Sequence, residues 1–480
     1  MKTTATQYLA RTVFLLSLAL LQSCGGSGGG GVSSPPGILF YALTEDSGGH
    51  GYIVENAISP SGQLYSPSPA PISTGGASTS SQDSGPVAFV LDPSASLAFA
   101  LNSNSSSSSF KNGSIESYNT STAQSPTGIQ SIAYTQTGIN PTSMAVDPRG
   151  NYLVVADHGS GTSTSPTGDV EIFSIGPNGV GQTSPTTISP SSSCSNPDKI
   201  VFPPLGSNGT TSDTFYVVCS SPELIASSTA PPTPALYRCT ISGSCSQIAL
   251  PSLSGTSNAI SNMEFSSSGT AFLPGETYTS SSSSYNAFLI PCTGSSSLSS
   301  CSSIANISSL SNTAPAGDFA VYNGSTPTAF IGNYSTNNSD SLSNQGIFFS
   351  CTSGSTSCSN FSYASSSSGD PTFLATNPGQ TSLYIVSTPD PLPTTTSSIS
   401  STPDGAVYVC SLPSVSSCTL TGTTTNYPVG ITFDPSGKFA FVPTWSGTIS
   451  IFQVGSNGQL TPAASSIVTT GNINLQVVVP

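Results

Sequence analysis

The sequence PVGITFDPSG at residues 428–437 has two close copies earlier in the chain, PTSMAVDPRG at 141–150 and PVAFVLDP at 86–93. Four weaker copies follow the same order and begin at Pro197, Ile260, Pro315 and Pro371. The seven starts recur at intervals of 55 to 63 residues. Self-similarity at a nearly fixed period of this length is the signature of a repeat architecture.

Each repeat carries four strand signals in a constant order. An alternating strand leads into a turn, of Asp-Pro type in the best copies, and a β-rich strand such as residues 152–156 follows. After a Ser/Thr-rich loop, a third strand often opens on glycine, as at Gly168 and Gly447, and a more polar fourth strand closes the unit. Period-two alternation indicates half-buried antiparallel strands. Four such strands in one repeat make up a propeller blade, so the sequence predicts an all-β propeller.

The two ends of the chain predict how the ring closes. Residues 38–75 contain signals for a second, third and fourth strand, but none for a first strand. Residues 473–479 look like a first strand with nothing after it. Pairing the two segments completes one blade and removes two exposed sheet edges. We therefore expect eight blades, with seven as the alternative because the copy near Ile260 is degenerate.

The composition limits both structure and function. Of the 480 residues, only 6% are charged, with 7 basic and 21 acidic side chains. This excludes a nucleic-acid binder that depends on a basic surface, and it disfavours a pocket for phosphorylated substrates. Serine, glycine and proline are abundant, and all three are unfavourable in helix interiors. We expect a single β-propeller domain over residues 38–480, with almost no helix.

The N-terminus has the features of an export signal. Residues 1–23 combine basic Lys2 and Arg11 with an apolar stretch at 13–21 that is too short to span a bilayer. The following Leu21-Gln22-Ser23-Cys24 resembles the lipobox of bacterial lipoproteins, which implies a lipid on Cys24. Residues 24–37 then read as a Gly/Ser-rich tether. The expected partner is the membrane, and the expected location is the cell envelope, facing the periplasm or at the cell surface. The alternative is an ordinary signal peptide with an incidental cysteine.

The cysteines fit an oxidising compartment. Setting Cys24 aside leaves ten of the 11 cysteines. No pair has the spacing of a zinc knuckle and the two histidines lie far upstream, so we expect disulfides, no metal and no cofactor. Four close pairs bracket turns between adjacent strands, and the fifth is assigned partly by elimination. The expected bridges are Cys194–Cys219, Cys239–Cys245, Cys292–Cys301, Cys351–Cys358 and Cys410–Cys418.

The last repeat carries a family resemblance. Residues 433–442, 447–452 and 457–462 together look like one blade of the lactonase family of β-propellers. That family includes the propeller type of 6-phosphogluconolactonase, and YVTN-type relatives share the blade pattern. Residues 147–173 are a second good match. The resemblance implies propeller architecture for the whole mature chain and makes a lactonase-type hydrolase one candidate activity.

Candidate site residues cluster after the predicted second strands, on the face of a propeller where ligands usually bind. Both histidines lie there beside carboxylates, and such groups can act as a general base or bind ligands. The only tryptophan lies there as well and offers a stacking surface for a sugar. The candidates for catalysis are Glu45, His50, Asp157 and His158. The candidates for ligand binding are Asp46, Asp169, Glu276 and Trp445. The alternative interpretation is a set of solvated polar loops. First-strand carboxylates at Asp198, Glu264, Asp318 and Asp370 are further candidates for the lining of the channel.

Two functions are compatible with these patterns. The favoured one is an exported, lipid-anchored binding or scaffold module of the cell envelope, expected to be a monomer with an unknown protein or saccharide ligand and no nucleic-acid partner. The alternative is a lactonase-like hydrolase that uses the His/carboxylate cluster, so an enzymatic role stays open. A purely structural surface protein is a third possibility. Convergence of His50 and His158 on one pocket would distinguish the enzyme from the others.

Overall fold

A computed structural model describes residues 37–480 with gaps. The longest gaps are 76–84, 104–111, 121–128, 160–167, 205–212, 221–232, 334–346 and 389–404, and the other gaps span at most five residues. The expected signal segment, Cys24 and the tether as far as residue 36 lie outside the described residues. The described part consists of strands and turns. It includes no helix long and apolar enough to cross a membrane.

The strands form eight antiparallel sheets, which we number as blades 1 to 8 in chain order. Blade 1 contains β1 (Ile38–Glu45), β2 (Gly51–Ile58), β3 (Leu64–Tyr65), β4 (Ile72–Ser73) and β35 (Ile473–Val478). Blade 2 contains β5 (Gly85–Leu91), β6 (Leu97–Ser103), β7 (Asn112–Asn119) and β8 (Gln130–Ile139). Blade 3 contains β9 (Pro141–Val146), β10 (Tyr152–Asp157), β11 (Asp169–Gly176), β12 (Gly179–Val180) and β13 (Thr186–Ile188). Blade 4 contains β14 (Pro197–Val201), β15 (Thr214–Cys219), β16 (Ala235–Thr240) and β17 (Cys245–Ile248).

The second half of the chain repeats this plan. Blade 5 contains β18 (Ser257–Ile260), β19 (Glu264–Phe265), β20 (Ala271–Thr279), β21 (Ser284–Cys292) and β22 (Ala305–Ser311). Blade 6 contains β23 (Pro315–Tyr322), β24 (Thr328–Asn333), β25 (Ile347–Thr352) and β26 (Ser359–Ser362). Blade 7 contains β27 (Asp370–Thr376), β28 (Ser382–Thr388), β29 (Gly405–Ser411) and β30 (Cys418–Thr424). Blade 8 contains β31 (Thr432–Phe433), β32 (Phe439–Pro443), β33 (Thr448–Val454) and β34 (Leu460–Thr469).

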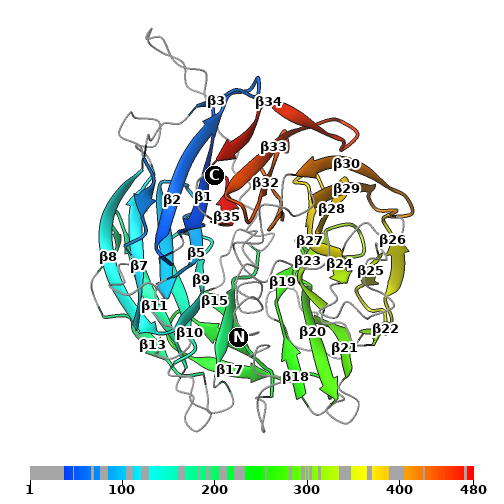
Figure 1. The fold of residues 1–480 in the computed structure, drawn as a ribbon. Coiled ribbons are helices and arrows are strands. Elements are labelled where there is room, and N and C mark those ends of the chain that lie inside the picture. Colours follow the sequence, from blue (N-terminus) through cyan, green and yellow to red (C-terminus); the bar gives the residue numbers. More distant parts are fainter. Residues whose placement is uncertain are drawn as a thin grey trace.

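The eight sheets stand around a common centre, so the predicted eight-bladed propeller is confirmed (Figure 1). Each blade has four strand positions, and in blades 1, 3 and 5 two short strands share one of them. The predicted closure is also confirmed, because β35 pairs with β1 in antiparallel register. Val477 lies opposite Ala42 in this pairing, and the C-terminal strand supplies the missing first strand of blade 1.

The hydrophobic core lies between neighbouring blades. Successive residues of a strand point to opposite faces of its sheet, so β1 packs against two neighbours at once. Phe40 faces blade 8, where its ring centroid lies 4.6 Å from that of Phe441. Tyr41 faces blade 2, with its ring centroid 5.8 Å from that of Phe89. All four rings are fully buried, and the same interleaving recurs around the ring.

The Asp-Pro turns join the first and second strands of three blades in the same way. Asp434 accepts hydrogen bonds from the backbone nitrogens of Ser436 and Phe439, at 3.0 and 2.6 Å. Asp92 and Asp147 make the equivalent bond to the residue five positions ahead, also at 2.6 Å. These buried carboxylates satisfy backbone donors of the turn, which is why the motif recurs at the same place in each blade.

The degenerate copy near Ile260 has a visible cause. Its first strand is split into β18 and β19, which pair with the same strand, β20. Between them, β20 contains Pro274, which has no N–H to donate to the ladder. The Pro274 carbonyl still accepts a hydrogen bond from the nitrogen of Ser261, at 3.0 Å. The sequence repeat is therefore weakest where the sheet itself is interrupted.

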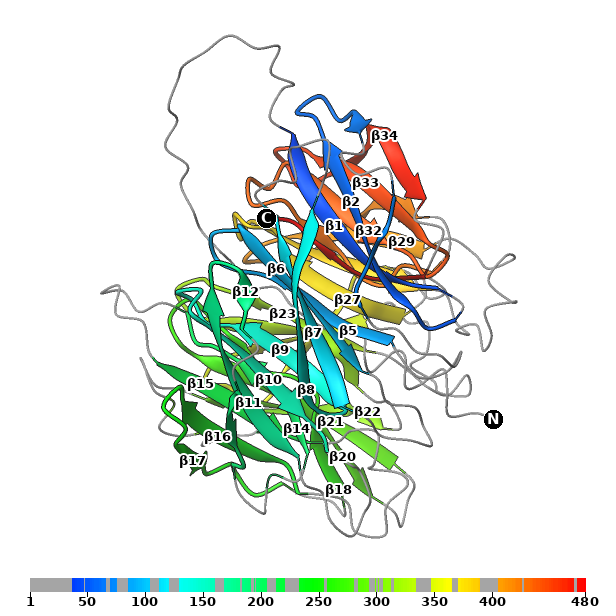
Figure 2. The same ribbon diagram turned by 90° about the vertical axis from the view of Figure 1, so that its left-hand side faces the viewer.

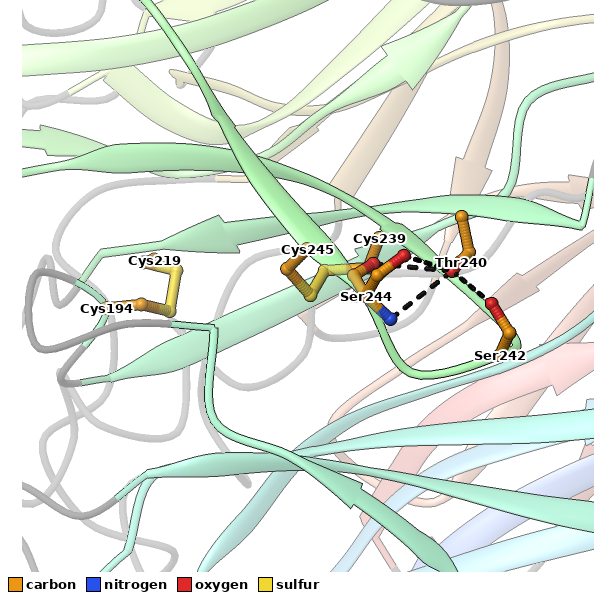
Figure 3. The surroundings of a disulfide bond; sticks show 7 residues. All are labelled: Cys194, Cys219, Cys239, Thr240, Ser242, Ser244 and Cys245. Carbon is orange, nitrogen blue, oxygen red and sulfur yellow. Dashed lines mark hydrogen bonds between the residues drawn. A yellow bond between two sulfur atoms is a disulfide. The ribbon is translucent and has the colours of Figure 1, made fainter.

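All five expected disulfides are present. Cys239 and Cys245 are directly opposite each other in β16 and β17, and this hairpin is also tied by Thr240, whose Oγ1 lies 2.8 Å from Oγ of both Ser242 and Ser244 (Figure 3). Corresponding bridges close the outer hairpins of blades 5, 6 and 7. Cys194–Cys219 instead joins the approach to β14 to the end of β15 (Figure 3). The polar outer strands have little core of their own, so a covalent bridge stabilises them by about 2–3 kcal/mol each in the loop-entropy model.

Candidate functional site

The topology brings most of the candidate residues to one end of the propeller. Second strands end, and first and third strands begin, at this end, which we call the upper rim. Asp157 ends β10 and lies opposite Asp169, which begins β11. Glu45 ends β1 opposite Gly51, and Trp445 follows β32. The upper rim is therefore the place where these side chains could act on a common ligand.

His50 is held by its own loop. Its Nδ1 lies 3.1 and 3.2 Å from the two carboxylate oxygens of Asp46. Asp46 also accepts hydrogen bonds from the backbone nitrogens of Gly48 and His50, at 2.8 and 2.9 Å. Partial burial opposes ionisation of Asp46, but these backbone bonds and the His50 ring outweigh it and lower the pKa of the carboxyl. The hydroxyl of Tyr52 also donates to Asp46, at 3.2 Å, so the pair closes a tight turn whose contacts all lie within residues 46–52.

His158 instead connects two blades. It follows β10 of blade 3, and its Nε2 lies 3.2 Å from Oδ1 of Asp198 on β14 of blade 4. Its backbone nitrogen donates to the carbonyl oxygen of Asn140, at 3.0 Å, just before β9 begins. The His158 side chain is about 10% exposed and that of Asp198 is 21% exposed. This contact, an ion pair when His158 is protonated, is thus recessed in the upper rim, between the end of β10 in blade 3 and the innermost strand of blade 4.

Three acids lie beside His158. Asp157 is fully buried, and neither of its carboxyl oxygens has a hydrogen-bond partner among the described residues. Burial raises its pKa well above the ordinary value, and the nearby Glu171 and Asp169 raise it further. Burial also raises the pKa of Asp169. The pKa of Glu171 rises to about 7, mainly because it is buried, even though its Oε2 accepts a bond of 2.8 Å from the nitrogen of Gly138. Burial thus shifts all three groups toward the protonated, uncharged state.

The remaining candidates lie in other surroundings. Glu276 is buried within β20, its Oε2 has no partner in the described part of the chain, and burial raises its pKa to about 7. Glu45 is buried at the end of β1, with its carboxylate close to Gly85 at the start of blade 2. Trp445 packs against the core of blades 7 and 8 with part of its ring exposed, and its backbone nitrogen donates to Tyr427, at 2.7 Å.

The structure groups only some of these side chains. Asp157, His158 and Asp169 lie together in blade 3, and Asp198 joins them from blade 4. His50 belongs to blade 1, with the whole of blade 2 between it and His158 in the ring. Each histidine ring has its own carboxylate partner. No set of three or more His, Cys, Asp or Glu side chains within the described ranges has an arrangement that could hold a metal ion.

Sequence reasoning missed Glu171. It reads as one polar residue in the third strand of its blade, and its burial depends on Gly138 of the preceding blade. A signal was nevertheless present, since glutamate recurs in the third strands of blades 1, 2 and 3, as Glu55, Glu116 and Glu171. Burial raises the pKa of the first two as well.

The buried Glu276 predicts a dependence of stability on pH. Its folded-state pKa is raised, so the folded chain holds the proton more tightly than the unfolded chain does. The resulting stabilisation is complete below the ordinary pKa of about 4.5 and is lost as the pH rises through about 7. The loss is on the order of 3 kcal/mol at pH 8.

We expect Glu276→Gln to unfold at higher urea concentration than the native chain at pH 8, with little difference at pH 5. Asp213→Asn, at a side chain that is 74% exposed, is the control, and parallel pH profiles for Glu276→Gln and the native chain would contradict the prediction.

Comparison with known proteins adds information on architecture alone. No family model matches the chain, and no curated protein matches it. Among solved structures, it is similar to a 6-phosphogluconolactonase-like protein from Bacteroides fragilis, with 11% identity, a TM-score of 0.42, and coverage of 92% of this chain and 98% of the other. It is also similar to Sqt1 from Chaetomium thermophilum, with 12% identity, a TM-score of 0.49, and coverage of 81% and 87%. The C-terminal WD40 domain of Sif2 gives 10% identity, a TM-score of 0.46, and coverage of 86% and 96%. Identities this low carry no inference about activity.

Proposed function

We propose that this chain is an exported, lipid-anchored propeller that binds an uncharged saccharide at the upper rim. The observation that carries the binding role is the recessed His158–Asp198 pair between blades 3 and 4. It offers polar groups at a blade junction, and propellers commonly bind ligands around the central channel. Burial raises the pKa of neighbouring Asp157, Asp169 and Glu171, which reduces the negative charge around this pair.

The low charge of the chain supports a neutral ligand. Buried amides and hydroxyls occur repeatedly at this end of the blades, including Asn102, Asn140, Asn196 and Ser220. They are bonded within the protein, as Nδ2 of Asn102 is to the Thr74 carbonyl oxygen at 2.6 Å, so they make the rim polar without adding charge. The partly exposed Trp445 adds an aromatic surface on the same rim. A protein ligand is the competing possibility, and it is an outcome of the binding test below.

The hydrolase alternative has less support. A single catalytic centre that uses both histidines needs them within hydrogen-bond reach of one substrate. His50 is instead bound within its own loop, and His158 is paired across a different blade junction. Asp157 is completely buried, so a substrate could not reach it without movement of the chain around it. These observations favour binding over catalysis.

The proposed location combines two features. Five disulfides are typical of an oxidising, extracytoplasmic compartment. The lipobox-like residues 21–24 follow a short apolar stretch and precede a glycine-rich tether. Together they support export followed by attachment of a lipid to Cys24, which would leave the propeller free to bind ligands at the membrane surface.

Anchoring is tested by mass spectrometry of the mature protein from membrane fractions. We expect the chain to begin at Cys24 with an attached lipid. Cys24→Ala should leave the membrane fraction, because a signal segment alone gives no lasting anchor after cleavage. The matched control is Ser27→Ala, which changes a residue of the tether. This variant should stay with the membrane. An unmodified N-terminus at another residue would overturn the anchoring proposal.

Ligand binding is tested with an array of envelope glycans and, in parallel, of envelope peptides. We expect saccharide binding that weakens by about tenfold or more in Asp198→Asn, the effect of losing roughly 1.4 kcal/mol of contact energy. Asp213→Asn, on a side chain that is 74% exposed and lies before β15 at the opposite end, should bind normally. Binding to peptides alone would contradict the saccharide proposal. Turnover of lactone substrates that depends on His158 would support the hydrolase instead.

A further inference from the structure

The outermost strand of blade 2 is attached to the ring in an unusual way. Strand β8 lies at the outer left of the ring in Figure 1, beyond β7, and it runs beside β7 and β11 in Figure 2. Ile132 and Tyr134 on this strand are 38% and 46% exposed. In blades 4 to 7 a disulfide pins the corresponding outer hairpin. Blade 2 contains no cysteine, so β8 depends on noncovalent contacts.

Buried glutamates from three blades bind β8. Glu55 of blade 1 accepts a hydrogen bond of 3.0 Å from the backbone nitrogen of Ile129, just before β8 begins. Glu171 of blade 3 accepts a bond of 2.8 Å from the nitrogen of Gly138, near the end of β8. Between them, Glu116 of blade 2 accepts a hydrogen bond from the hydroxyl of Ser131. The strand is therefore held near both ends and in between by carboxyl groups.

The charged groups that the structure describes around β8 are acids. Fully buried Asp157 on β10 packs against Gly138, where a Cβ would lie 2.9 Å from its carboxyl carbon, and Asp169 is close to both Asp157 and Glu171. Strands β2, β7, β8, β10, β11 and β12 contain no lysine or arginine. Beyond the end of β8, the next ionisable groups among the described residues are His158, which is paired with Asp198, and Lys199 on β14. Nothing in these strands would neutralise several carboxylates at once.

We propose that β8 is a pH-sensitive strand, which Glu55, Glu116 and Glu171 hold against the ring while they are protonated and which loosens as they ionise. Ionisation releases one proton from each carboxyl group to solvent and leaves negative charges that are buried away from water. Opening of β8 hydrates these charges, so the open form is favoured as the pH rises. Opening also exposes the edge of β7 that β8 otherwise covers.

The direction of the pH dependence follows from the pKa values of the three carboxyl groups. Burial raises the pKa of all three glutamates, that of Glu171 to about 7. The closed form is therefore stabilised below the ordinary pKa of about 4.5, and the stabilisation is lost as the pH rises toward and through 7. The shift for Glu171 alone corresponds to a change in the opening equilibrium on the order of 100-fold.

Hydrogen exchange measured by mass spectrometry tests the proposal on the mature chain with its disulfides intact. After correction for the intrinsic effect of pH on exchange, we expect the protection of residues 130–139 to fall on the order of 100-fold between pH 5 and pH 8. Strand β30, an outer strand pinned by Cys410–Cys418, is the internal control and should keep its protection. Constant protection of β8, or an equal fall in β8 and β30, would overturn the proposal.

Variants identify the responsible groups. Glu171→Gln keeps an oxygen that can accept the bond from Gly138 but cannot ionise, so it should reduce the pH dependence of exchange in residues 136–139. The triple change Glu55→Gln, Glu116→Gln and Glu171→Gln should remove the dependence throughout β8. Glu276→Gln alters a buried acid in a distant blade and should leave exchange of β8 as in the native chain. A native-like pH dependence in a folded Glu171→Gln variant would contradict the proposal even if the triple variant does not fold.

Discussion

The pairing of β35 with β1 is the constraint on which the rest of the structure depends. Each blade buries its faces only against its neighbours, so an open ring would leave the facing surfaces of two blades exposed. The residues that close the ring come from the two ends of the described chain, with Val477 opposite Ala42. Because this one strand completes blade 1, it lets the Phe40–Phe441 and Tyr41–Phe89 contacts form on both sides of that blade.

The architecture could be predicted because its determinants are local and repeated. The Asp-Pro turn at Asp434 and the complementary strand signals at the two ends are visible in the sequence, and they yielded the blade number and the closure. The spacing of the cysteines around the predicted turns yielded the disulfides. The site could be predicted only in part. A shift of one residue in strand register turns a side chain to the other face, so the sequence did not reveal that Asp198 faces His158. The burial of Glu171 depends on Gly138, which is brought to it by the packing of two blades.

The two halves of the ring stabilise their outer strands differently. Blades 4 to 7 use disulfides, which do not respond to pH, whereas the outer strand of blade 2 relies on buried glutamates. The same group of acids adjoins the His158–Asp198 pair through Asp157 and Asn140. The proposed ligand site thus lies next to the part of the ring whose stability depends on protonation, while the disulfide-bonded half provides a constant support.

Thermal unfolding of a chain truncated after Thr470 tests the closed ring most directly. We expect the apparent midpoint to fall by roughly 5 °C or more, because β35 is lost and the inner edge of β1 is exposed. A chain that lacks only Pro480, which is exposed and follows the last strand, is the matched control and should unfold like the full-length protein. Unfolding of the chain truncated after Thr470 at the same temperature as the full-length protein would contradict closure by the terminal strands.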